Sequence, residues 1–414
     1  MLQFECQILC LYTFHYPLFT YYMYNATNAV VLKPGREVHA RNRHPWVFLG
    51  AIESFPQFNN GDFLPVIDAA GVFLGHGYFN KGQSIVGRMI NFDTTNPLEA
   101  FVTHMRNAIA LRQNNIPLQT TAYRLINGEG DFLPGLIVDV YGPVLVLQIN
   151  TLGIEKLKPT IINALQEAFP SNAVYEKSST STRKKEGLPD ANGWLVGEHA
   201  MPLTILENNV QFSVDIVAGQ KTGFFLDQRD MRSLVQTHAK GKNVLNCFAY
   251  TGGFSLYALK GGATKADSVD TDKRASLLTQ QNLELNGYGP SQGAALTEDV
   301  FHYLERMSSS LYDFVVLDPP AFAKRASDIP NASRGYRELN RLAFQKLPPG
   351  GLLLTSSCSA HINRELFQTI IFQAAKDAKR NVKILSYHLL AADHPINLYY
   401  PEGDYLKSLL LWVE

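Results

Sequence analysis

The chain has 414 residues, of which 46% are hydrophobic and 18% are charged, and its formal net charge at pH 7 is zero. This length predicts two or three domains, each with its own core. A net charge of zero excludes a protein-wide field that attracts nucleic acid, so any such site must be a local basic cluster. The sequence contains no run of 18 apolar residues, which argues against a membrane span.

Residues 1–29 form a doubtful N-terminal extension. The first 22 residues contain seven aromatic residues, no Lys or Arg, and two of the four cysteines, Cys6 and Cys10. This composition lacks the positive n-region and the uninterrupted apolar centre of a secretory signal. We expect translation to start at Met23, and the alternative is a genuine extension that packs on the first domain.

Beyond that extension the only cysteines are Cys247 and Cys358. Two cysteines in a chain of this size form no disulfide framework, so a cytoplasmic location is expected. Neither cysteine belongs to a CxxC motif or has a nearby pair of histidines, so no metal site is expected.

The first half of the chain divides into two predicted domains. Residues 30–95 contain short β-prone runs between Gly- and Pro-rich turns, which predicts a small, mostly β barrel. Helical spacing over residues 96–112 predicts a connecting helix, and the strand-like runs and the helical segment 154–169 predict a central α+β domain over residues 96–215. Within this domain, residues 178–187 are predicted to form a polar, solvated loop that carries Arg183, Lys184 and Lys185.

Residues 216–414 have the pattern of an α/β domain. Helical stretches separate short apolar runs at 244–247, 265–270, 314–318, 352–356, 382–389 and 406–412. This alternation predicts βαβ units around a mainly parallel sheet, in the manner of a Rossmann-like domain. Because ligands of such sheets bind beyond the carboxyl ends of the strands, the residues that follow each run are candidate site residues.

A glycine-containing loop and an aspartate follow the first two of these runs. The loop, residues 248–253, ends in Gly252 and Gly253, which allow a tight turn and close approach of a ligand. Asp270 ends the next run, where a carboxylate accepts hydrogen bonds from ribose hydroxyls. The pyrophosphate motif G-x-G-x-x-G is absent, so S-adenosylmethionine is the expected cofactor. Asp299 is placed to contact its adenine amino group, and the alternative role of Asp299 is a helix N-cap.

Asp318 and Cys358 follow two later runs. Asp318 precedes Pro319 and Pro320, which stiffen the backbone so that the carboxylate can read the edge of a planar base, although a structural turn is the alternative. Cys358 lies among serines directly after a strand, which favours exposure to the cleft and a nucleophilic role over packing. A thiolate that adds to C6 of cytosine makes C5 nucleophilic. We interpret Cys247 as a core residue.

Several motifs together resemble those of one family. They are residues 35–48 and 71–80, residues 130–139, residues 221–229, residues 245–254, residues 318–320 and residues 357–359. In this order they resemble the bacterial RlmI-type ribosomal RNA large-subunit cytosine-C5 methyltransferases, over roughly residues 30–414. Many RNA cytosine-C5 methyltransferases have a second cysteine after the Asp-Pro motif, where this chain has Pro320 and Ala321. A mechanism with two cysteines is therefore not expected.

The resemblance implies an N-terminal PUA domain at residues 30–95, the central domain at residues 96–215, and an S-adenosylmethionine-dependent domain at residues 216–414. It also implies that Gln228 and Arg229 line the cofactor pocket and that the substrate is large-subunit ribosomal RNA. Together with the motifs, it gives a predicted cofactor site of Gln228, Arg229, Phe248, Tyr250, Thr251, Gly252, Gly253, Asp270, Asp299 and Asp318, and predicted catalytic residues Cys358 and Asp318.

Two local basic clusters are candidate RNA contacts, because basic side chains neutralise phosphates and aromatic ones stack on unpaired bases. The first cluster comprises Lys33, Arg36, Arg41, Arg43, His44 and Trp46. The second comprises Lys324 and Arg325, with Arg334, Arg337 and Arg341 further along the chain. For each cluster the alternative is an ordinary solvated face.

The sequence thus predicts methyl transfer to C5 of a cytosine in ribosomal RNA, and it leaves the oligomeric state open, with a homodimer as one alternative. One alternative is a methyltransferase that acts on a guanine nitrogen, which needs Asp318 but no thiol. Another is a non-catalytic RNA-binding assembly factor. A nicotinamide dehydrogenase fits less well, since the glycine fingerprint is absent.

Overall fold

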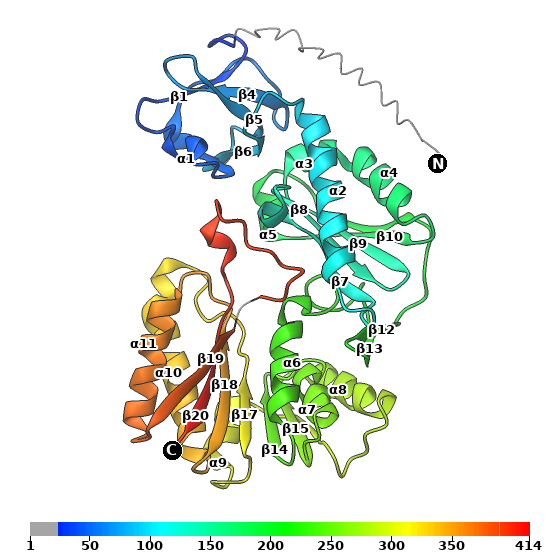
Figure 1. Ribbon diagram of the computed structural model, residues 1–414, viewed down its shortest axis with the longest axis vertical. Helices are drawn as coiled ribbons and strands as arrows, with labels where there is room; N and C mark the ends of the chain where they lie inside the picture. The colour runs from blue at the N-terminus through cyan, green and yellow to red at the C-terminus, as the bar shows by residue number, and fades with distance from the viewer. Residues whose placement is uncertain (1–23, 389) are drawn as a thin grey trace, which may run out of the picture.

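The computed structural model describes residues 24–388 and 390–414 (Figure 1). Residues 1–23 of the predicted N-terminal extension, including the expected start at Met23, lie outside these residues, whereas residues 24–29 lead into the first strand. Among the helices described, none has the length and apolar character needed to cross a membrane. The described part of the chain also holds no group of His, Cys, Asp or Glu side chains that could bind a metal ion.

The N-terminal part of the described chain is a six-stranded sheet with the order β2-β6-β5-β4-β1-β3. Val30, Val66 and Phe79 belong to its apolar core. The elements are β1 (Val30–Leu32), α1 (Val38–Arg41), β2 (Trp46–Phe48), β3 (Ile52–Ser54), β4 (Phe63–Ile67), β5 (Phe73–Phe79) and β6 (Ile85–Asn91).

Helix α2 (Pro97–Asn115) connects this sheet to the next region. It begins where predicted, because the side chain of Asn96 accepts a hydrogen bond from the backbone N–H of Leu98 and Pro97 fits the first turn. A five-stranded sheet follows, with the order β11-β10-β9-β8-β7, and then a separate hairpin of β12 and β13. The strands are β7 (Ala122–Asn127), β8 (Leu136–Tyr141), β9 (Val144–Ile149), β10 (Ala173–Ser178), β11 (Ala191–Val196), β12 (Leu203–Glu207) and β13 (Val210–Val214).

Two local predictions in this region are wrong. The single helix expected over residues 154–169 is two helices, α3 (Leu152–Lys156) and α4 (Lys158–Ala168). The solvated loop expected around Arg183 is mostly helix α5 (Ser181–Lys185), and Arg183 is only 1% exposed. The guanidinium of Arg183 lies 2.7 Å from the carboxylate of Glu155, a partner that the local sequence does not reveal.

The C-terminal part contains a seven-stranded sheet with the order β16-β15-β14-β17-β18-β20-β19. Strands β14 to β18 are parallel, and β20 is antiparallel to both of its neighbours. The strands are β14 (Asn243–Cys247), β15 (Lys265–Asp270), β16 (Ala295–Thr297), β17 (Phe314–Leu317), β18 (Gly351–Ser357), β19 (Val382–His388) and β20 (Lys407–Val413). The predicted α/β fold and the strands expected from the sequence are confirmed within one or two residues.

Helices cover both faces of this sheet (Figure 1). Along each central strand alternate side chains enter different cores, as the pleat requires. Val244 and Phe314 pack with α6, α7 and α8, whereas Leu245 and Val315 pack with α9, α10 and α11. The helices are α6 (Arg229–His238), α7 (Gly253–Lys260), α8 (Lys273–Leu285), α9 (Val300–Arg306), α10 (Ile329–Lys346) and α11 (Arg364–Asp377).

The segment between β19 and β20, residues 390–406, leaves the sheet and extends between the two preceding regions (Figure 1). We call it the connecting segment. Arg112 donates a hydrogen bond to the carbonyl of Asp393, at 2.7 Å. The ring of Tyr400 lies 4.9 Å from the ring of Trp46, centroid to centroid. The connecting segment therefore contacts all three parts of the described chain before it leads into β20.

Candidate active site

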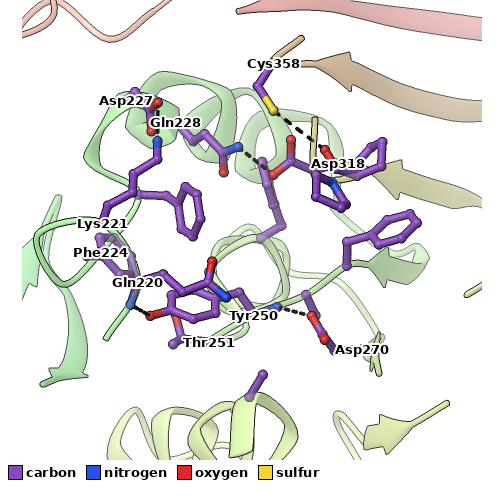
Figure 2. Close-up of a pocket in the computed structure, with 18 of the residues that line it drawn as sticks. Gln220, Lys221, Phe224, Asp227, Gln228, Tyr250, Thr251, Asp270, Asp318 and Cys358 are labelled. Atoms are coloured by element: carbon purple, nitrogen blue, oxygen red, sulfur yellow. Dashed lines mark hydrogen bonds and ion pairs between the residues drawn. The ribbon is translucent and has the colours of Figure 1, made fainter. Parts of the chain in front are cut away.

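A cavity of about 490 Å³ opens at the carboxyl ends of β14, β15, β17 and β18. The chain reverses its direction across the sheet here, since β15 and β17 lie on opposite sides of β14. Figure 2 shows Asp270, Tyr250, Lys221, Asp227, Gln228, Asp318 and Cys358 around a common open centre. The structure thus brings together most of the residues that the sequence singles out.

The loop after β14, residues 248–253, has an unusual backbone. Phe248 and Tyr250 have φ angles of 59° and 47°, which non-glycine residues adopt only when their surroundings hold them there. Thr279 provides one such restraint by donating a hydrogen bond to the carbonyl of Tyr250, at 2.9 Å. Gly252 has φ 79°, and a Cβ atom at this position would lie 2.7 Å from Cγ2 of Thr279. The loop is therefore packed into one shape that lines the cavity.

Asp270 ends β15 at the edge of the cavity. One carboxylate oxygen accepts the backbone N–H of Tyr250 at 2.9 Å, and the other accepts that of Asp272 at 3.0 Å. Each oxygen retains a further lone pair. The carboxylate is thus held in place and can still accept hydrogen bonds from the hydroxyls of a ribose.

Asp318 follows β17 and is held by two side chains. Gln228 donates to one oxygen at 2.5 Å, and the hydroxyl of Ser356 donates to the other at 3.0 Å. Burial raises the pKa of the Asp318 carboxyl, and these two hydrogen bonds only partly oppose the effect. Asp318 therefore holds a proton more readily than an ordinary aspartate, although its charged form still acts on its neighbours.

Cys358 follows β18, the neighbour of β17, as the sequence predicts. Its thiol is half-buried, lines the cavity, and lies 3.9 Å from the carbonyl oxygen of Pro319. Burial, and after it the charge of Asp318, raises the pKa of the thiol to about 11. Cys247 lies in the apolar core, with no exposed surface, as expected. The two thiols therefore differ in access, and only Cys358 can meet a substrate.

The lining of the cavity also includes residues that were not predicted, among them Lys221, Asp227 and Tyr405. The ammonium of Lys221 lies 2.7 Å from the Asp227 carboxylate, and the hydroxyl of Tyr405 donates to the same oxygen at 2.6 Å. Burial alone would raise the pKa of Asp227, but the charges of Lys221 and His394 lower it below its usual range. Lys221 and Asp227 belong to the motif at residues 221–229, so the sequence could have pointed to them. Tyr405 belongs to the connecting segment, where no local motif predicts a site residue.

Three predicted cofactor-site residues, Arg229, Gly252 and Asp299, do not line the cavity. Arg229 is not among the residues that line the cavity, because its buried guanidinium forms two hydrogen bonds with Asp393, at 2.8 and 3.0 Å. The side chain of Asp299 caps helix α9 by accepting the backbone N–H of His302 at 3.0 Å. Asp299 also lies outside the cavity lining, so the structure agrees with the N-cap alternative.

The first basic cluster is partly neutralised by acidic residues that are distant in sequence. Arg41 pairs with Asp68, and buried His44 lies 3.3 Å from the Glu402 carboxylate. The indole N–H of Trp46 donates to Glu129 at 2.9 Å. His44 and Trp46 therefore serve contacts between regions rather than a free surface. Exposed members of the cluster are Lys33, Arg36, Arg41 and Arg43, and of these Arg41 is paired with an acidic residue.

The second basic cluster is reduced in the same way. Arg337 lies 2.6 Å from Asp377, and Arg341 lies 2.5 Å from Glu338. Lys324 and Arg325 are exposed in the segment that follows the Asp318 motif. These two remain the candidates for contact with a polyanion near the cavity.

The cavity fits a nucleoside that carries an amino-acid tail. Its volume is sufficient for such a molecule, Asp270 presents carboxylate oxygens at one side, and the walls include the rings of Phe224 and Phe248. The backbone of residues 251–253 enters helix α7, whose first N–H groups favour a carboxylate. No phosphate-binding glycine pattern is present in the loop.

Comparison with known proteins identifies the class. Residues 161–380 match the model of the S-adenosylmethionine-dependent methyltransferases, and residues 30–92 match that of PUA-like domains. The fold is similar to that of the SMU.776 protein in its complex with SAH, with a TM-score of 0.80, 26% identity, and coverage of 93% of this chain and 99% of that one. The chain is an S-adenosylmethionine-dependent methyltransferase with a PUA-like domain, and S-adenosylmethionine is its cofactor.

Sequence relatives identify the family. The chain is 43% identical to ribosomal RNA large subunit methyltransferase I of Shewanella denitrificans over 391 residues, which cover 92% of this chain and 98% of the relative. It is 41% identical to the protein of the same name from Photobacterium profundum, over 94% of this chain and the whole of the relative. The chain belongs to the ribosomal RNA large subunit methyltransferase I family, which confirms the resemblance seen in the sequence.

Proposed function

We propose that the protein methylates C5 of a cytosine in large-subunit ribosomal RNA, with Cys358 as the nucleophile and Asp318 as its partner. One observation carries this proposal: a thiol and a carboxyl with a raised pKa line the same cavity from the ends of adjacent strands. Methylation of a guanine nitrogen does not require a thiol, so Cys358 would have no catalytic role in it. We place the reaction in the cytoplasm, where thiols remain reduced.

In this scheme the Cys358 thiolate forms a bond to C6 of the base, and the electron pair of the C5–C6 double bond moves toward N3. Asp318 donates a proton to N3 and so stabilises the adduct. S-adenosylmethionine supplies the methyl group that C5 receives. The C5 proton then leaves to solvent, the C6–S bond breaks to release the thiolate, and N3 returns its proton to Asp318, which restores the aromatic ring.

Residues around the cavity have supporting roles in the proposal. Gln228 and Ser356 orient the Asp318 carboxyl, and Asp270 holds the ribose of the cofactor. The loop 248–253 receives the methionine end. Lys33, Arg36, Arg43, Lys324 and Arg325 contact RNA phosphates. Because the target base must leave its stack to reach Cys358, unpaired regions of the RNA are the expected targets.

The test is incubation of the protein with labelled S-adenosylmethionine and unmodified large-subunit RNA, followed by digestion and identification of the nucleoside. We expect 5-methylcytidine. A methylated guanosine would reject the cytosine assignment and leave Cys358 without a catalytic role. If no label is transferred, a cofactor titration separates an unsuitable RNA from a binding factor that no longer holds the cofactor.

A further inference from the structure

Lys407 is a buried lysine whose ammonium is bonded to the carbonyl of Ser359, the residue that follows the proposed nucleophile. It is the first residue of β20, is only 4% exposed, and lies opposite Ser357 in the β18–β20 pair. Its ammonium donates hydrogen bonds to the carbonyls of Ser359 and Tyr405, each at 2.7 Å. Both residues that flank Cys358 are thus attached to Lys407, one through the strand pairing and one through the ammonium.

The charge of Lys407 has no carboxylate partner among the described residues. The nearby Asp404 accepts a hydrogen bond from Arg364, at 2.7 Å, and acts on Lys407 through its charge without forming an ion pair with it. A lysine has three N–H donors, and the structure gives partners for two of those of Lys407. A buried ammonium that is held only by carbonyls is costly, and a thiolate at Cys358, whose charge favours the charged form of Lys407, would provide negative charge.

The other charges around this pair act in both directions. Asp318 and Asp227 disfavour the Cys358 thiolate, and Lys221 favours it. Burial lowers the pKa of Lys407 to about 8, while Cys358 and Asp404 raise it and Arg364 lowers it. Lys221 is already paired with Asp227, at 2.7 Å. Lys407 is a second cation whose charge is coupled to Cys358, and it forms no ion pair with a carboxylate of the described residues.

We propose that Lys407 is a positioning residue for the nucleophile: its ammonium fixes the turn at residues 357–359 and stabilises the Cys358 thiolate by charge. The thiol proton leaves to solvent, and no bond forms between the two side chains. The role in methyl transfer rests on the proposed function. The effect on thiol reactivity does not, because it is a property of the folded chain without RNA.

A distinctive pH dependence follows for the wild-type chain. Below pH 8, reaction of Cys358 with iodoacetamide should rise about tenfold per pH unit, as the thiolate fraction rises. Above about pH 8 the slope should fall, because Lys407 loses the charge that favours the thiolate. A thiol that is independent of Lys407 would keep the same slope.

The experiment measures alkylation of the Cys358 peptide by mass spectrometry, from pH 6.5 to 9.5, in the full-length chain. Lys407→Met should react about tenfold more slowly at pH 7.5 and show no change of slope. Lys407→Arg should retain most of the reactivity, also without the change of slope, because a guanidinium does not titrate in this range. Lys383→Met is the matched control, an exposed lysine on the adjacent strand β19, and should behave as wild type.

Equal or faster alkylation of Lys407→Met would overturn the proposal, since loss of a merely structural lysine would loosen the turn and expose the thiol. If Lys407→Met melts below the assay temperature, Lys407→Arg and the slope of the wild-type profile decide the question. Methylation assays separate the two proposals: full activity of Cys358→Ser would reject the covalent scheme and leave the alkylation result unaffected.

Discussion

The carboxyl edge of the seven-stranded sheet and the basic face of the N-terminal domain differ in how their polar groups are held. At the sheet edge, Asp318 and Asp270 each form two hydrogen bonds and still face the cavity. On the N-terminal face, Arg41 and His44 are paired with acidic residues that leave them little capacity for a ligand. Charge in the sequence is therefore a weaker guide to a binding surface than a polar residue at the end of a parallel strand.

Replacement of Cys358 is the strongest test of the sheet edge. Cys358→Ser should lower methylation of large-subunit RNA at least about 10³-fold, because a hydroxyl is a far weaker nucleophile than a thiolate. Cofactor affinity, measured by calorimetry, should not change. Cys247→Ala is the control, since that thiol lies in the core, and it should lower thermal stability while activity at low temperature persists. Retention of activity by Cys358→Ser would contradict the covalent scheme.

Asp318→Asn tests the electrostatic part of the site. Methyl transfer should fall about 10²-fold, because an amide does not donate a proton to N3 as a carboxylic acid does. The same change should speed alkylation of Cys358 at pH 7.5, since the charge of Asp318 contributes to the raised pKa of the thiol. Slower alkylation together with slower methylation would instead indicate a general loss of structure.

Asp318→Asn should lower activity but raise the folding stability of the protein at neutral pH. The pKa of Asp318 is raised by burial, so the unfolded chain releases this proton at a lower pH than the folded chain. Stability is therefore lost as the pH rises through that interval, and the penalty persists at neutral pH. Asp318→Asn should raise the melting temperature at pH 7 and lose this advantage at pH 3, as calorimetry at the two values can show. If Asp318→Asn changes the melting temperature by the same amount at pH 7 and at pH 3, the argument that burial raises the pKa of Asp318 is wrong.

The site residues at the carboxyl edge of the sheet could be predicted because each one directly follows its own strand in the sequence. An apolar run followed by Asp or Cys places that residue at the end of a strand, and parallel strands bring their ends together. Residues whose partners are distant in sequence could not be predicted. Buried Arg183 forms an ion pair with Glu155, and the indole of Trp46 donates a hydrogen bond to Glu129. Lys407 lies beside the end of β18 only because β20 pairs with β18 after the connecting segment.

The smallest effect is expected on the basic face of the N-terminal domain. A test there shows directly whether its unpaired basic side chains contact RNA. Lys33 and Arg36 are exposed and have no ion pair among the described residues. The double variant Lys33→Ala, Arg36→Ala should lower the slope of log affinity against log salt by about 2, one for each lost phosphate contact. The matched control removes a neutral pair instead, Arg41→Ala with Asp68→Asn, and should leave the slope unchanged. Filter-binding titrations over a range of salt concentrations measure both. Equal slopes for the two double variants would mean that RNA phosphates do not contact this face. The same titration on the double variant Lys324→Ala, Arg325→Ala would then test whether the rim of the cavity provides the main phosphate contacts.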